Sequence, residues 1–276
     1  MYKPVQSMVL SLTLAFLALT WSNAAVTPLV LYDNFQSTHI DPAKWVGEPA
    51  SLPNATDKDR REVKIELVGE DDSRRLHISQ TAYSSIADNN GDGGVGFGLG
   101  FANPSMVKSV SFTLAVGTEE VGCGADDPAW AGAGFFGDYF NPSGAQDGQT
   151  GDIVASIGVG RLSTDNVTTL DASASVSQCQ DAQCNGQTVL VSQDLGPVQA
   201  GSTNRYSATW DQPNHQFVFR LNNNASVALP YNLPDSLPPG LSDKSFYVFA
   251  SIPHCTTAPR PVTQIDAFVG SVYVNR

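Results

Sequence analysis

The chain has 276 residues and a formal net charge of −12 at pH 7, and only 15% of its residues are charged. An acidic surface repels the phosphates of nucleic acids and the head groups of anionic lipids, so the charge argues against binding to either. The low charge content, the 24 glycines and the 17 prolines are typical of many short strands and turns rather than of charged helices.

The N-terminal segment predicts an exported protein. Lys3 precedes an apolar run over residues 9–19, and a Ser-Asn-Ala cleavage site follows this run. We expect residues 1–24 to be a signal peptide and residues 25–276 to form one domain, secreted or periplasmic. Loss of Lys3 would take the formal charge from −12 to −13. The apolar run is shorter than the roughly 20 residues that cross a bilayer, so membrane insertion is not expected.

Alternating apolar and polar residues predict strands along most of the chain. Between residues 107 and 116 the apolar side chains share one parity and Ser or Thr the other, which is the period of a half-buried strand. The turn residues 211–214 join 205–210 to 215–222 as an antiparallel hairpin. Further strands are expected at 28–35, 63–68, 75–81, 153–159, 170–177, 187–192, 245–251 and 264–274. So many strands do not fit one open sheet, so the sequence predicts an all-β fold of two stacked antiparallel sheets.

The chain has four cysteines, and an even number in an exported protein favours disulfides. Cys123, Cys179, Cys184 and Cys255 allow three pairings. The short spacing between Cys179 and Cys184 suits a local loop, which would leave Cys123 to pair with Cys255, and the other two pairings stay open. A zinc site with four thiolates is disfavoured because only one pair of cysteines is close in sequence.

The segment 88–93 fits the first half of a calcium-binding loop, in which Asp88, Asn90 and Asp92 would supply oxygen ligands at alternate positions. The final position of such a loop is Leu99 instead of Glu, which excludes an EF-hand. Calcium would therefore need a further carboxylate from elsewhere in the chain. The alternative interpretation is a plain flexible turn without metal.

The stretch 126–152 gathers aromatic residues and aspartates among glycines, and we expect a loop here. Sugars lay their C–H faces on aromatic rings and hydrogen-bond carboxylates through their hydroxyls, so such a loop would suit a glycan platform. The candidate ligand-binding residues are Asp126, Asp127, Trp130, Asp138 and Tyr139. The competing interpretation places Trp130, Phe135 and Phe136 in the core and leaves the aspartates in solvent.

Five segments carry a resemblance to a known family: Leu31–Phe35, Ile40–Trp45, Asp72–Ile78, Tyr206–Asn222 and Gln264–Asn275. They look like scaffold motifs of the concanavalin A-like lectin and glucanase superfamily, including its laminin G-like modules. The resemblance implies a jelly-roll sandwich with Trp45 and Trp210 in its core. Calcium-bearing loops, common in lectins of this type, are a second implication. These motifs describe the scaffold and carry little information about activity.

No catalytic motif survives inspection. The superfamily's retaining glucanases carry Glu-x-Asp-x-x-Glu on one strand, and this chain lacks that string. Glu62 and Glu66 share a strand face, but four residues at roughly 3.3 Å each place them about 13 Å apart, farther than either mode of glycoside hydrolysis needs. Arg60-Arg61-Glu62 bears only a weak resemblance to a motif of the superfamily's alginate lyases. The four histidines, His39, His77, His215 and His254, are predicted to be structural.

The sequence therefore predicts an exported, non-catalytic recognition module that binds carbohydrate. Two alternatives stay open. One is a polysaccharide-active enzyme, a glycoside hydrolase or lyase, whose catalytic residues come from separate strands. The other is a structural or adhesive extracellular protein, which would present a wide apolar patch or a sheet edge.

Overall fold

The computed structural model describes residues 28–47, 59–84, 92–122, 128–144, 147–253 and 262–275. The expected signal peptide lies outside these residues. The described chain is built from strands joined by turns, with three short 3-10 turns at Asp71–Ser73, Pro104–Met106 and Gln212–Asn214. In this described part, no helix is long and apolar enough to cross a membrane.

Sheet A has eight strands in the spatial order β13-β12-β11-β6-β15-β4-β3, and β1 also pairs with β15. Each pairing is antiparallel. The strands are β1 (Val30–Asp33), β3 (Asp59–Val68), β4 (Arg75–Ser84), β6 (Ser109–Val121), β11 (Asn204–Asp211), β12 (Gln216–Leu221), β13 (Val227–Pro230) and β15 (Val262–Asn275).

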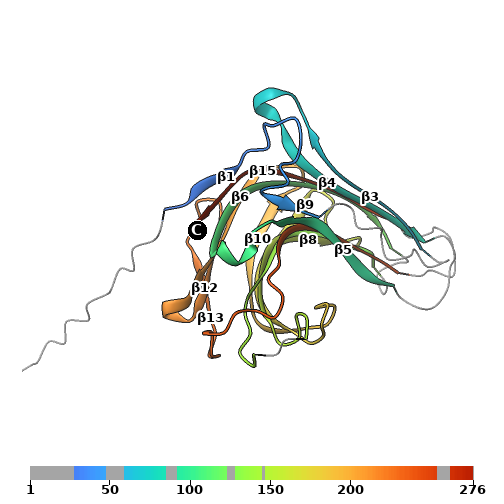
Figure 1. The fold of residues 1–276 in the computed structure, drawn as a ribbon. Helices are drawn as coiled ribbons and strands as arrows, with labels where there is room; N and C mark the ends of the chain where they lie inside the picture. Colours follow the sequence, from blue (N-terminus) through green and yellow to red (C-terminus); the bar gives the residue numbers. More distant parts are fainter. Residues whose placement is uncertain are drawn as a thin grey trace, which may run out of the picture.

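Sheet B has seven strands in the order β10-β9-β8-β7-β14-β5-β2, again all antiparallel. They are β2 (Trp45–Val46), β5 (Asp92–Phe101), β7 (Trp130–Phe140), β8 (Ile153–Leu162), β9 (Thr169–Cys179), β10 (Gln187–Gln199) and β14 (Lys244–Ile252). Figure 1 shows the two sheets stacked and curved together, with sheet B on the inner side of the curve. The exposed face of sheet B is therefore concave.

The core lies between the sheets and is dominated by aromatic side chains. Phe112 of sheet A packs against Phe246 of sheet B with ring centroids 4.8 Å apart. Trp45 lies 4.8 Å from Phe101 and donates from its indole Nε1 to Asp33 Oδ2 at 2.8 Å. Burying the apolar face of each sheet against the other is the main source of stability in such a sandwich.

The all-β two-sheet prediction is confirmed, and every strand expected from alternation is present with shifted ends. The predicted hairpin of β11 and β12 has the expected antiparallel register, with Ala208 opposite Phe219. Trp45 is buried in the core as expected. Trp210 is half-buried and packs against the core from its edge.

The expectation of a loop between residues 126 and 152 is wrong for its larger part. Residues 130–140 form β7, a strand in the interior of sheet B. Its side chains alternate: Ala131, Ala133 and Phe135 point into the core, whereas Trp130 and Phe136 are half-buried on the other face. Strand β5 is likewise a glycine-rich strand that alternation did not predict.

Candidate functional site

A groove of about 650 Å³ lies on the concave face of sheet B. Residues from β5, β7, β8 and β14 line it, together with one loop that follows β9 and another that precedes β14. The lining residues are Val46, Gly47, Gly98, Gly100, Trp130, Phe136, Ser156, Gln183, Cys184, Asn185, Gln187, Asp243, Ser245, Tyr247 and Phe249. A smaller cleft of about 240 Å³ shares Trp130, Ser156 and Tyr247 with it, so the hollow continues across β8 and β9.

Strand register makes the middle of this face nearly free of side chains. Gly134 of β7 lies opposite Gly158 of β8, and Gly132 lies opposite Gly160. A Cβ on Gly134 would lie 2.4 Å from a carbonyl oxygen of β8, and one on Gly158 would lie 2.4 Å from a carbonyl oxygen of β7. Real Cβ atoms do not approach backbone so closely, so these two positions accept only glycine.

Aromatic rings stand on this glycine floor. The indole of Trp130 lies against Gly132 and Gly160, where an added Cβ would come within 3.0 Å of the ring. Trp130 meets Phe249 of β14 edge to face, with centroids 4.6 Å apart. Tyr247 lies next to Phe249 on the same face of β14, and burial raises the pKa of its phenol to about 12, so the hydroxyl is protonated at neutral pH. Together these rings form a half-buried apolar platform.

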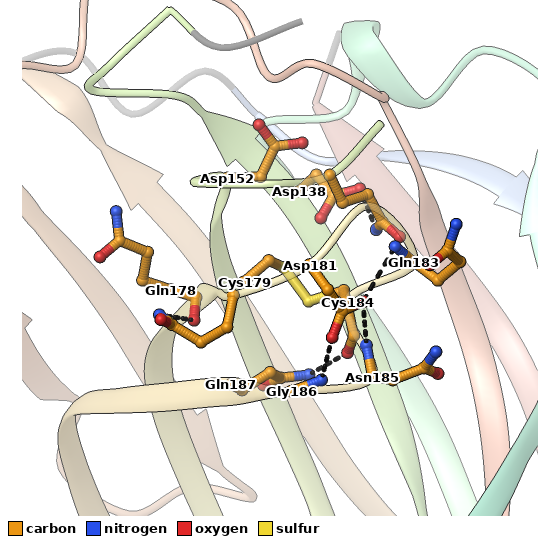
Figure 2. The surroundings of a disulfide bond; sticks show 12 residues. Asp138, Asp152, Gln178, Cys179, Asp181, Gln183, Cys184, Asn185, Gly186 and Gln187 are labelled. Atoms are coloured by element: carbon orange, nitrogen blue, oxygen red, sulfur yellow. Dashed lines mark hydrogen bonds between the residues drawn. A yellow bond between two sulfur atoms is a disulfide. The ribbon is translucent and has the colours of Figure 1, made fainter. Parts of the chain in front are cut away.

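One rim of the groove is the disulfide loop, residues 179–187 (Figure 2). The Cys179–Cys184 disulfide closes it, as the favoured pairing predicts. The Asp181 carboxylate accepts the backbone N–H groups of Gln183 and Asn185 at 3.0 Å each and that of Gly186 at 2.7 Å. These N–H groups lower the pKa of Asp181, because they stabilise its ionised form.

The disulfide loop points exposed amide side chains at the groove. Gln183, Asn185 and Gln187 all line it. The side-chain amides of Gln183 and Asn185 form no hydrogen bond with another described residue, whereas that of Gln187 reaches Cys184 O at 3.4 Å. An amide offers both donors and an acceptor, so this rim suits a ligand rich in hydroxyl groups.

Asp243 is the one carboxylate among the described residues that line the groove, and burial raises its pKa. The neighbouring cleft adds Asp165 and Asp171. Asp165 Oδ2 accepts the backbone N–H of Leu162 at 2.8 Å. Glycoside hydrolysis needs two carboxyl groups flanking one bond, and within the described part of the groove Asp243 has no second carboxylate beside it.

The predicted ligand-binding residues lie in different parts of the structure. Trp130 lies in the groove. Asp138 and Tyr139 are buried, at 0% and 4% exposure, so the expectation that they form an exposed platform with Trp130 is wrong. Asp126 and Asp127 lie outside the described residues. Phe135 is in the core, as the competing interpretation has it, whereas Phe136 is not.

Asp138 belongs to a buried polar network between the loops that follow β7 and precede β14. Its Oδ2 accepts Gln149 Nε2 at 2.9 Å and the backbone N–H of Asp243 at 3.1 Å. Asp152, equally buried, accepts Asn141 Nδ2 at 2.8 Å and the N–H of Gly240 at 2.7 Å. Burial raises the pKa of Asp138 to about 8. These aspartates therefore fasten the loops instead of facing a ligand.

The predicted calcium loop falls mostly outside the described residues. Asp88 and Asn90 lie outside the described residues, and Asp92 is the first residue of β5. In the part of the chain that is described, no three His, Cys, Asp or Glu side chains gather as a metal site. Cys123 and Cys255 also lie outside it, so their pairing stays a prediction.

His77 has the structural role expected of it, far from the groove. On the outer face of sheet A its ring contacts Glu66 Oε1 at 3.2 Å and Asp266 Oδ1 at 2.7 Å. The ring stacks on Phe268 with centroids 4.6 Å apart. These contacts join β3, β4 and β15 across the face of the sheet.

Sequence reasoning missed five groove residues: Phe136, Gln183, Asn185, Tyr247 and Phe249. A signal was present in β14, where Phe246 and Val248 alternate with Tyr247 and Phe249. Apolar residues on both parities of a strand mean that both faces are covered. In β14, Phe246 and Val248 face the core, and Tyr247 and Phe249 line the groove.

No family model and no curated protein matches the chain. Among solved structures, a Bacillus licheniformis β-glucanase matches at 12% identity and a TM-score of 0.41, over 88% of this chain and 96% of that one. A laminarinase from Flavobacterium sp. UMI-01 matches at 11% and 0.40, over 90% and 100%. The Emp47p carbohydrate recognition domain matches at 10% and 0.33, over 84% and 100%.

Identities and TM-scores this low carry no argument about the activity of this chain. The two stacked antiparallel sheets are themselves the fold that the concanavalin A-like motifs predict. At the level of fold, the chain is a jelly-roll sandwich of two antiparallel sheets.

Proposed function

We propose that the chain is an exported recognition module that binds a glycan in the concave groove of sheet B and does not cleave it. The observation that carries this proposal is the aromatic platform of Trp130, Phe249 and Tyr247 on a floor of facing glycines. A pyranose ring is flat and has apolar C–H faces, so it fits an aromatic platform from which other side chains are absent.

The rim supports the same ligand class. The exposed amides of Gln183, Asn185 and Gln187 stand beside the platform and match the hydroxyl groups at the edge of a sugar ring. Lys and Arg are absent from the described lining of the groove, and its one charged residue is Asp243. An uncharged polysaccharide is therefore favoured over an acidic one, since Asp243 and the negative net charge repel acidic chains.

Asp243 is the observation that favours the enzymatic alternative. Burial raises the pKa of Asp243, which is the direction of shift that favours a general acid. A hydrolase also needs a base or nucleophile across the scissile bond, and the described lining offers Asp243 no such partner. Binding without cleavage is therefore preferred.

Export and calcium belong to the same proposal. The Cys179–Cys184 disulfide suits an oxidising compartment, which agrees with the signal peptide expected at residues 1–24. Calcium at Asp88, Asn90 and Asp92 stays a prediction, which running the binding experiment below once with added calcium and once with EDTA would test.

Affinity electrophoresis through gels containing uncharged β-linked or α-linked glucans tests the proposal. The wild-type chain should be retarded by at least one polysaccharide, and Trp130→Ala should weaken that binding by about tenfold or more, equivalent to about 1.4 kcal/mol. The matched control is Tyr273→Ala on the outer face of sheet A, where the ring meets Arg205 at 5.6 Å. This control should bind as the wild type does.

Two results would overturn the proposal. An equal loss of polysaccharide binding in Trp130→Ala and Tyr273→Ala would show that the binding site is not the groove. Release of reducing ends from the retarding polysaccharide, abolished by Asp243→Asn, would establish the enzymatic alternative.

A further inference from the structure

Another cleft, of about 270 Å³, lies at one end of the sandwich, apart from the groove and its neighbouring cleft. We call it the end cleft. Inward-facing residues of both sheets, among them Tyr139 and Lys244 of sheet B and Trp210 of sheet A, form its walls, and residues 235–239 cover it. At about 30 Å³ per water molecule its volume corresponds to roughly nine waters, which is enough for a small organic molecule.

The end cleft contains a buried cation that no carboxylate of the described residues contacts directly. Lys244 is 3% exposed. Its Nζ donates to the backbone carbonyl of Asp138 at 2.6 Å and lies 4.4 Å from the centre of the Tyr139 ring. No carboxylate of the described chain lies within 4.0 Å of this nitrogen. A buried ammonium group in this situation is unfavourable, because its lost hydration is only partly replaced.

Burial outweighs the two acidic side chains, Asp138 and Asp243, that act on this charge without contacting it. Asp138 uses Oδ2 to accept Gln149 and Asp243, and its Oδ1 has no partner among the described residues. Burial raises the pKa of Asp138 above its ordinary value, so the carboxyl is largely protonated and uncharged at neutral pH. Burial correspondingly lowers the pKa of Lys244 to about 8, which leaves much of it charged at pH 7.

The rest of the end cleft complements an anion that has an apolar part. Lys108 adds a second cation, 5.8 Å from the centre of the Trp210 ring. The hydroxyls of Tyr139 and Ser242 are buried without a hydrogen-bond partner in the described chain. The one carboxylate in the lining, Asp235, is occupied by the Tyr231 hydroxyl at 2.6 Å and by His215 Nδ1 at 3.1 Å.

We propose that the end cleft binds a small organic carboxylate, with its charged group between Lys244 and Lys108 and its apolar part against Trp210. A monoanion is favoured over a phosphate dianion, because Asp235 and the net charge of −12 oppose a higher negative charge. The carboxylate would supply the acceptor that the buried ammonium lacks.

Isothermal titration calorimetry with glucuronate and with glucose tests this proposal, since the two probes share a ring and differ in the carboxylate. Glucuronate should bind with a dissociation constant of about 1 mM, whereas glucose should not bind at this site. Lys108→Gln should weaken glucuronate by about tenfold, as expected for a lost charged contact. The matched control is Lys64→Gln on sheet A, whose side chain is 61% exposed, and it should bind as the wild type does.

A variant of Lys244 tests the premise separately. Lys244→Met should fold, should be at least as stable as the wild type in thermal unfolding, and should not bind glucuronate, because it removes a charge whose burial outweighs its compensation. Equal binding of glucose and glucuronate, or unchanged affinity in Lys108→Gln, would refute the site. A large loss of stability in Lys244→Met would show that the ammonium is already compensated, and would also refute it. Both probes are titrated into the Trp130→Ala variant, which weakens the proposed groove binding, so the two proposals fail independently.

Discussion

A buried ion pair joins the two sheets beside the groove. Arg161 of β8 pairs through Nη2 with Glu120 Oε2 of β6, and the two side chains are 5% and 0% exposed. The pairing is incomplete, because Glu120 Oε1 and Arg161 Nε have no partner among the described residues. Burial lowers the pKa of Arg161. Removing one partner would leave the other charge buried alone, so Glu120→Leu or Arg161→Met should each lower the free energy of unfolding by about 3–5 kcal/mol.

Thermal and chemical unfolding measure this loss. For a chain of this size about 1 kcal/mol corresponds to about 2–4 °C, so each single variant should melt about 6–20 °C below the wild type. The double variant Glu120→Leu/Arg161→Met should recover wild-type stability or exceed it, since an apolar pair replaces two incompletely bonded charges. The reasoning is refuted if the single variants stay within about 1 kcal/mol of the wild type, or if the double variant loses the sum of both single effects.

Three further predictions follow from single side chains. Asp181→Ala should weaken polysaccharide binding with little change in melting temperature. Because the pKa of Asp181 is lowered, polysaccharide binding by the wild type should decline only below pH values of about 3.9, the ordinary pKa of Asp. The same decline of binding at low pH in the variant would contradict this. Gly158→Ala should lower the melting temperature strongly, whereas Gly117→Ala, with nothing within 4 Å of its added Cβ, should not; equal effects would disprove the steric argument. Wild-type stability should decline as the pH rises from about 4 to 8, because the folded chain keeps a proton on Asp138 that the unfolded chain releases. Asp138→Asn should flatten this decline. An unchanged pH profile in thermal unfolding would refute the raised pKa of Asp138.

Alternation in the sequence predicts the strands whose faces differ in polarity. Strands such as β6 and β15 carry their apolar residues on one parity, and the hydrophobic effect alone determines which face is buried. Alternation does not predict strands β5 and β7, because glycine occupies much of the face that they turn toward the groove, and glycine is rare in strands. Their glycines reflect the close approach of neighbouring backbones, which depends on strands far away in the sequence.

The candidate site is harder to predict because pairing between distant strands creates it. β14 lies beside β7 only through long-range pairing, which brings Phe249 opposite Gly132 and next to Trp130. The error at Asp138 and Tyr139 has a local cause. The register of β7 with β8 shifts between Asp138 and Phe140, and both residues before Phe140 are buried. Both residues were expected in a loop, whereas they lie in β7 at a bulge, where two neighbouring side chains are buried.

The glycine floor also restricts which side chains can stand in the middle of the groove. A catalytic carboxylate needs a Cβ, and a Cβ at Gly98, Gly134 or Gly158 would lie between 1.9 and 2.4 Å from a backbone oxygen. These positions share one row across the sheet, in which Tyr247 lies opposite both Gly98 and Gly134. Side chains are therefore excluded from the middle of the groove except for the Tyr247 ring. A sugar ring resting there would meet backbone and the aromatic face of Tyr247.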